Sequence, residues 1–182
     1  IIHPEDLAGL RMRVMASPTE ARVWASLGAI PVPLPFADIE NSMKQGEIDA
    51  AEDTSAVYAT QRHYEIGPYH SLTGHQWSVA MIIANTRLAS DISKDLPEAL
   101  RAAGESISKP AIDVAISDQI SQTEALHQIP DVHVIEPDIG AFKAATKQML
   151  EEIAEKTDMR PALSIIQENT VMTEPEGEQA HV

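Results

Sequence analysis

An alternating apolar pattern near the start of the chain predicts a β-strand with one buried face. Leu10, Met12 and Val14 alternate with Arg11 and Arg13, which is the two-residue period of a strand. The pattern runs directly into a helix start, and this strand-then-helix order is typical of α/β proteins. It also places two arginines on the opposite face of the strand, in a chain that is strongly acidic overall.

The helix start after this strand is marked by three residues. Ser17 can cap the helix, Pro18 suits the first helical position, and Glu20 stands where it would complete a capping box. Apolar residues then recur at helical spacing until Gly28, a residue type that commonly ends helices. We therefore expect a short amphipathic helix over residues 17–28.

The same alternation of strand and helix patterns continues to the end of the chain and predicts an α/β architecture. The apolar patterns indicate strands or extended segments over 29–34, 47–52, 76–85 and 132–136, and helices over 37–45, 54–63, 95–128, 138–156 and 161–169. Segment 76–85 is apolar on both faces, which is typical of a buried strand. Pro110 falls inside the long helix and is expected to kink or split it. The acidic tail from Thr173 is expected to be disordered.

Composition excludes several classes of partner and site. The chain has 182 residues and a formal net charge of −15, which argues against nucleic acid or an anionic membrane as a partner. It contains no cysteine, so a disulfide or a thiolate site is impossible. No apolar run is long enough to span a bilayer. No hydrolase, phosphate-loop or dinucleotide motif occurs, so the sequence suggests no cofactor.

Three groups of residues could carry chemistry. Arg11 and Arg13 are either solvated charges or, for one of them, a planar fork that binds a carboxylate in a cleft. The acidic stretch 46–58 lies near a strand end and a helix start, where α/β proteins bind ligands, although Asp53 could also serve as a helix cap. His63, His70 and His75 are a conceivable metal site, but their spacing matches no compact metal motif, so we expect none.

Several stretches in order resemble the solute-binding proteins of tripartite ATP-independent periplasmic (TRAP) transporters. They read PEDLAGLRMRV, LGAIPVPLPFADIENSMKQGEIDAAED, HYEIGPYHSLTGH and VHVIEPDIGAFKAA, and the resemblance covers about residues 1–157. It implies a two-lobe α/β fold, like that of other periplasmic binding proteins, with the ligand cleft between the lobes. It also implies that a removed signal peptide and much of the first lobe would precede this segment, so the fold is expected to be incomplete here.

The resemblance also implies the binding residues. Arg13 matches the arginine that pairs with the ligand carboxylate, whereas Arg11 is expected to be peripheral. Phe36 matches an aromatic wall of the pocket, and His75 matches a histidine at the cleft rim, with Trp77 close behind it. Asp53 stands where the family has asparagine. An ionised aspartate only accepts hydrogen bonds, which would favour a ligand hydroxyl or ammonium group there.

From the resemblance we expect a periplasmic receptor that binds a small organic acid, with a hydroxy acid or a sugar acid favoured. It would be a monomer that delivers the ligand to an ion-gradient-driven membrane permease. The expected division is residues 1–78 in the second lobe, 79–130 returning into the first lobe with the long helix, and 131–182 in the second lobe again.

Two alternatives of other classes stay open. One is a small α/β enzyme that uses Asp53 and His75 as an acid–base pair, and it would turn over its ligand. The other is a dimerisation module that associates through the long helix over 95–128, and it would form a stable oligomer without ligand.

Overall fold

A computed structural model of the chain describes residues 1–76, 79–85, 87 and 94–171. These residues divide into two compact units: residues 1–52 with the part of the chain from 138 onward, and residues 53–137. The expected strand residues Trp77 and Ser78 and the expected disordered tail lie outside the described residues. The expected lobe boundaries at 78 and 130 refer to a longer two-lobe fold and stay a prediction.

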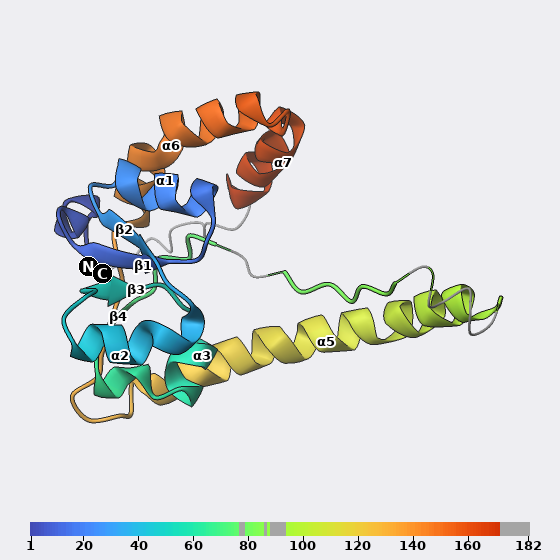
Figure 1. The fold of residues 1–182 in the computed structure, drawn as a ribbon, viewed down its shortest axis with the longest axis horizontal. Helices are drawn as coiled ribbons and strands as arrows, with labels where there is room; N and C mark the ends of the chain where they lie inside the picture. The colour runs from blue at the N-terminus through green and yellow to red at the C-terminus, as the bar shows by residue number, and fades with distance from the viewer. Residues whose placement is uncertain (77–78, 86, 88–93, 172–182) are drawn as a thin grey trace, which may run out of the picture. The chain divides into compact units, whose positions relative to one another are not determined.

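The first unit is built on a three-stranded parallel sheet in the order β2-β1-β3 (Figure 1). Strand β1 (Arg11–Val14) lies in the centre, β2 (Ile30–Pro33) on one side and β3 (Ala50–Ala51) on the other. The parallel order confirms the α/β class expected from the sequence. Pro31 and Pro33 are tolerated in β2 because an edge strand has one row of backbone groups that no neighbouring strand uses.

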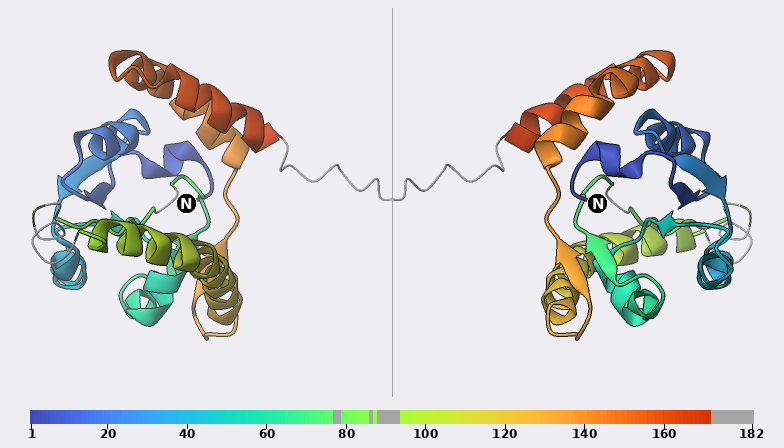
Figure 2. Two further views of the ribbon diagram at one scale, coloured as in Figure 1. Left: turned by 90° about the vertical axis from the view of Figure 1, so that its right-hand side faces the viewer. Right: turned by 90° about the vertical axis from the view of Figure 1, so that its left-hand side faces the viewer.

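Helices and short 3₁₀ turns complete the first unit. They are the 3₁₀ turn η1 (Pro4–Leu7), α1 (Pro18–Ser26), the turn η2 (Phe36–Asp38), α2 (Ile39–Lys44), α6 (Ile139–Lys156) and α7 (Arg160–Val171). Helix α1 packs on β1 and β2 with one face and on α6 with another. Helix α7 folds back along α6, and Figure 2 shows the two as an orange and red pair.

The core of the first unit lies between the sheet and α1. It is formed by buried apolar side chains from η1, β1 and α1 with the turn that follows α1: Leu7, Met12, Val14, Trp24, Leu27 and Ala29. Gly28 ends α1 with a φ of 88°, and a Cβ there would meet the Ala8 backbone at 3.4 Å. The positive φ is a conformation that residues with side chains rarely adopt, so glycine is favoured at this point, where the end of α1 meets the chain that enters β1.

The second unit contains α3 (Ser55–Thr60), the turn η3 (His63–Glu65), β4 (Tyr69–Ser71), α5 (Leu96–Leu126) and β5 (His133–Ile135). Strands β4 and β5 pair in parallel, and Figure 2 shows them side by side in light green and orange. Helix α3 packs against α5. The helix predicted from residue 54 is capped by Thr54, whose side chain accepts a hydrogen bond from the Val57 amide at 3.2 Å.

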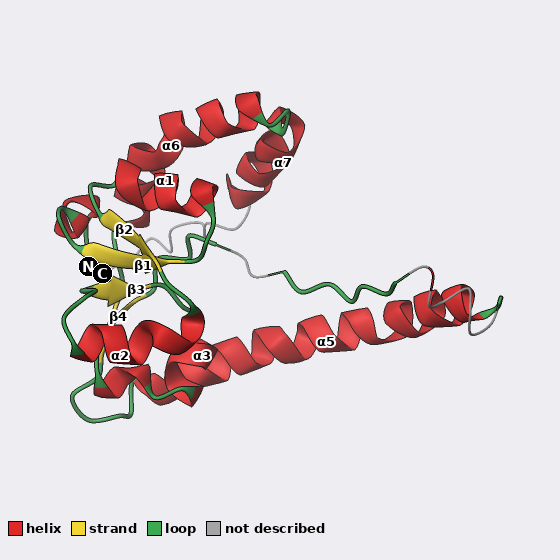
Figure 3. Cartoon of the chain, in the orientation of Figure 1, coloured by secondary structure: helices red, strands yellow, loops and turns green. Residues whose placement is uncertain are grey.

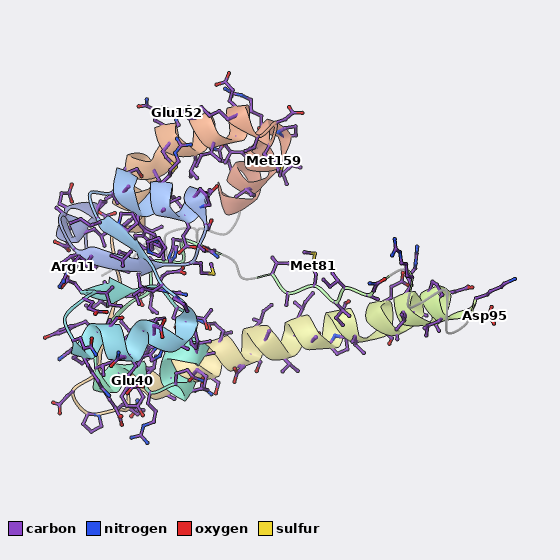
Figure 4. All side chains as sticks on the ribbon, viewed as in Figure 1. Arg11, Glu40, Met81, Asp95, Glu152 and Met159 are labelled. Atoms are coloured by element: carbon purple, nitrogen blue, oxygen red, sulfur yellow. The ribbon has the colours of Figure 1, made fainter. Side chains whose placement is uncertain are left out.

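One prediction for the second unit is wrong, and another is wrong in part. Residues 79–85 form no strand (Figure 3), and their apolar side chains are exposed, as at Met81 (81%; Figure 4) and Ile83 (89%). A strand needs a paired neighbour and a covered face, and no described residue provides them for this segment. The expected split at Pro110 is absent, because α5 runs through the proline as one helix, whereas the expected kink stays a prediction. The proline removes one backbone donor, and the hydrogen bonds on either side maintain the helix.

Candidate functional site

The two arginines of β1 have different environments although they lie on the same face of the strand. The Arg11 side chain is 40% exposed, whereas that of Arg13 is 6% exposed. Arg11 forms a bidentate pair with Asp49, in which Nε lies 2.8 Å from Oδ2 and Nη2 lies 2.6 Å from Oδ1. It also donates to the Gly46 carbonyl. Arg11 therefore ties β1 (Figure 4) to the segment that enters β3.

The pair with Arg11 makes the stability of the protein dependent on acid. Hydrogen bonds from the side chain and backbone of Arg11 lower the pKa of Asp49 from 3.8 to about 2. A depressed pKa contributes stability above the unfolded-state value, and that stability is lost as the pH falls through the folded-state value. We expect the free energy of unfolding to fall between about pH 4 and pH 2 partly through Asp49.

This prediction can be checked by denaturant unfolding at a series of pH values. Asp49→Asn should lower stability at neutral pH and flatten the pH dependence between about pH 4 and pH 2. Asp38→Asn, at an exposed position of the same unit, is the control and should leave the slope unchanged. Equal slopes in the wild type and Asp49→Asn would contradict the prediction.

Arg13 lies at the carboxyl end of the sheet, beside a hollow in the first unit. Its Nε donates to the Leu34 carbonyl at 3.1 Å, and its Nη1 lies 3.9 Å from Glu52 Oε1. Within the described residues no hydrogen bond reaches Nη2. The hollow has a volume of ≈ 340 Å³ and is lined by Arg13, Met15, Ala16, Pro33, Leu34 and Pro35. A buried guanidinium beside an apolar hollow is suited to binding one small anion.

The turn between β1 and α1 shapes one side of this hollow. Ser17 caps α1 as predicted, because its hydroxyl accepts a hydrogen bond from the Glu20 amide at 3.3 Å. The predicted capping box is wrong: the Glu20 carboxylate accepts a hydrogen bond from the Met15 amide at 3.0 Å, not from Ser17. Its side chain instead reaches past the cap to the amide of Met15, the residue that follows β1.

Phe36 comes directly after Pro35, the last residue in sequence that lines the hollow. It begins the turn η2, and its side chain is 46% exposed. Phe36 is not among the residues that line the hollow, and its role as an aromatic wall of the pocket stays a prediction.

The other candidate residues lie in the second unit. Asp53 accepts a hydrogen bond from the Thr54 amide at 2.9 Å, and its Oδ2 lies 3.7 Å from His63 Nδ1. His75 is exposed, and its Nδ1 lies 2.6 Å from the Thr73 hydroxyl. Among the described residues, the histidine seen near Asp53 is therefore His63. From the sequence, His63 was considered only as a possible metal ligand. Trp77 lies outside the described residues.

The histidines of the second unit have separate partners. His70 Nε2 lies 2.9 Å from the Ser55 hydroxyl, and its ring stacks on Tyr58 with centroids 4.4 Å apart. Burial lowers the pKa of His70, so the neutral imidazole is favoured there. No group of three or more histidine, aspartate or glutamate side chains in the described parts of the chain could hold a metal ion.

Comparison with known proteins places the chain in a family. The family model described as bacterial extracellular solute-binding protein, family 7, matches residues 1–157. The chain belongs to this family. The resemblance inferred from the sequence motifs is thereby confirmed. None of the helices in the described residues has the length and hydropathy needed to cross a membrane.

Relatives of this family 7 protein include periplasmic receptors. The 2,3-diketo-L-gulonate-binding periplasmic protein YiaO of Escherichia coli is 31% identical over 97 residues, which cover 53% of this chain and 30% of that protein. The ectoine-binding periplasmic protein TeaA of Halomonas elongata is 25% identical over 169 residues, which cover 86% of this chain and 47% of that protein. The chain spans half or less of the length of each of these relatives.

Solved structures show the same fold. A TRAP periplasmic solute-binding protein from Roseobacter denitrificans, with bound β-D-glucuronate, superposes on this family 7 chain with a TM-score of 0.77 and 27% identity. The match covers 92% of this chain and 56% of that one. The α/β fold class of these binding proteins, expected from the sequence, is confirmed.

Proposed function

We propose that the chain is part of a solute receptor that binds a small organic acid through its carboxylate. The observation that carries the proposal is Arg13, a buried guanidinium beside an apolar hollow at the carboxyl end of a parallel sheet. Ligands of open α/β sheets bind at this edge. The planar guanidinium binds a carboxylate through two parallel hydrogen bonds and keeps its charge at every physiological pH.

Membership in a solute-binding family supports a receptor, which binds its ligand without changing it. The ligand class is supported by two of the relatives, one named for binding 2,3-diketo-L-gulonate and one solved with bound β-D-glucuronate. We infer a sugar acid or a related hydroxy acid as the ligand, with Phe36, Asp53, His75 and Trp77 as further binding residues. We also infer a periplasmic monomer that passes the ligand to the membrane permease of a TRAP transporter.

The test is a thermal-shift screen on the protein expressed with any flanking sequence that its gene encodes. The panel contains D-galacturonate, D-glucuronate, L-galactonate and 2,3-diketo-L-gulonate, and D-galactose is the matched control that lacks the carboxylate. We expect at least one acid to raise the melting temperature and D-galactose to have no effect. Calorimetry then measures Kd. Equal shifts with D-galactose, or no binding by any acid, would contradict the proposal.

The same samples discriminate between the alternatives. NMR of the ligand after long incubation should show the starting compound, whereas a product would favour the enzyme that uses Asp53 and His75. Gel filtration without ligand should show a monomer, whereas a stable dimer would favour association through α5.

A further inference from the structure

Glu20 is a carboxylate on the buried face of α1. It precedes Trp24 by four residues and Leu27 by seven, so it shares their face of the helix, and it is 8% exposed. An ionised carboxylate is rarely buried unless a positive charge or several donors stabilise it. The surroundings of its two oxygens therefore determine its charge.

The two oxygens differ in what they bind. Oε1 accepts the Met15 amide, as described above, whereas Oε2 is fully buried and meets no hydrogen-bond donor in the described part of the chain. A buried acceptor without a donor is costly. The cost is removed if Oε2 carries a proton, because a carboxylic acid then becomes a donor.

An acceptor for such a proton is available in Glu52. This residue follows β3 directly, its side chain is 11% exposed, and its carboxylate interacts with that of Glu20. Arg13 supplies one positive charge against these two carboxylates. With both carboxylates ionised, the buried cluster would carry a net negative charge, and one proton on the pair restores neutrality.

The effects on the pKa of Glu20 agree with this geometry. Burial raises the pKa, and the charge and hydrogen bond of Glu52 raise it further, whereas the Met15 amide and the charge of Arg13 lower it. The net shift is upward. Of the other elements packed on α1, β2 carries no titratable side chain, and on α6 Glu152 pairs with Arg22 at 3.5 Å on the surface.

We propose that Glu20 and Glu52 share a single proton site next to Arg13 that is only partly occupied near neutral pH, and that a carboxylate ligand bound at Arg13 increases the occupancy of this same site. The ligand brings a further negative charge to the cluster, and protonation of Glu20 lowers the resulting repulsion. Affinity for an anionic ligand then rises as the pH falls through the range in which the pair titrates. The second half of the proposal rests on the function proposed above, whereas the first half does not.

The shared proton can be tested without any ligand. In protein labelled with ¹³C at the glutamate carboxyl carbons, an NMR titration should show one carboxyl that titrates at higher pH than exposed glutamates. Glu20→Gln should remove this resonance, and Glu52→Gln should move its titration to lower pH. Glu5→Gln, at an exposed position of the same unit, should leave it in place. If no carboxyl titrates above the range of exposed glutamates, the proposal is wrong, whatever the protein binds.

The linkage to ligand can be tested by calorimetry with the sugar acid that binds in the screen. Heats measured in two buffers of different ionisation enthalpy should reveal proton uptake, and Kd should change by up to about tenfold per pH unit. Glu20→Gln keeps an acceptor for the Met15 amide and mimics the neutral acid. It should bind without proton uptake and with a Kd that does not depend on pH in this range.

The outcomes separate the two proposals. Binding of a sugar acid with no proton uptake would overturn the linkage and leave the receptor function standing. A shared proton seen by NMR with no binding by any acid would overturn the receptor function alone. Proton uptake that persists in Glu20→Gln would place the titrating group elsewhere and contradict the assignment to Glu20.

Discussion

Replacing Arg13 with alanine is expected to abolish measurable binding of an organic acid at micromolar concentrations. The ligand carboxylate would lose its buried charge partner, and removing one member of such a pair typically costs about 3–5 kcal/mol. That range corresponds to a loss of roughly two to three decades or more in affinity. Calorimetry with the acid identified in the screen measures the effect, and circular dichroism verifies that the variant is folded.

Two further variants show whether the charge or its geometry matters. Arg13→Lys should recover little affinity, because an ammonium group cannot bind both carboxylate oxygens in a planar fork. Arg11→Ala, two residues away, should change Kd by less than about tenfold, because Arg11 is engaged with Asp49 and lies partly in solvent. Normal binding by Arg13→Ala would disprove the carboxylate anchor. If only Arg11→Ala lost binding, the carboxylate anchor would be Arg11 and the assignment to Arg13 would be wrong.

The second large effect is expected from Trp24, which fills the core between α1 and the sheet. It is 4% exposed, and truncating a buried tryptophan to alanine removes apolar contacts and leaves a cavity. Such changes cost about 3–5 kcal/mol, which is a large part of the 5–15 kcal/mol that usually stabilises a domain. Denaturant unfolding followed by circular dichroism should show an unfolding midpoint at much lower denaturant concentration for Trp24→Ala.

Ile30→Ala is the matched control for Trp24→Ala. Ile30 is an apolar residue of the same unit that is 52% exposed, so its truncation should cost far less. A similar loss of stability in both variants would mean that the core is not centred on α1 and the sheet.

The helix starts were predicted correctly because their signals are local. Ser17, Thr54 and Asp138 each accept a hydrogen bond from a backbone amide three residues later, and each is a residue type that commonly caps helices. The strand β1 was also expected, from its alternating pattern, and β2 lies within the segment 29–34 that was expected to be extended. Helix caps and local strand patterns depend on residues that are close in sequence, so they can be recognised from the sequence itself.

The wrong and missing predictions depend on contacts between distant residues. Strand β4, three residues long, was missed because it is defined by its pairing with β5, some sixty positions later. The pattern of 79–85 satisfies the requirements of a buried strand, yet burial needs a second surface that the pattern does not specify. A local apolar pattern therefore shows which side chains a segment could bury, but burial occurs only if another part of the protein packs against them.

The candidate site shows the same limit. Arg11 and Arg13 are equivalent in the alternating pattern, and they differ because Asp49 meets one and Glu52 approaches the other. The role of Glu20 was obscured by the strong capping signal around Ser17. Its position four residues before Trp24, on the apolar face of the helix, was the signal that could have identified it as a buried carboxyl.

The prolines of β2 have a consequence for how the protein behaves in a crowded solution. Ile30 and Leu34 direct their amides to β1, where they bond the carbonyls of Leu10 and Val14. Pro31 and Pro33 fall between them, so at these positions the outer margin of the sheet offers no amide hydrogen. An incoming strand from another molecule would find acceptors there without matching donors. The residues that permit β2 to end the sheet also discourage its growth into intermolecular aggregates.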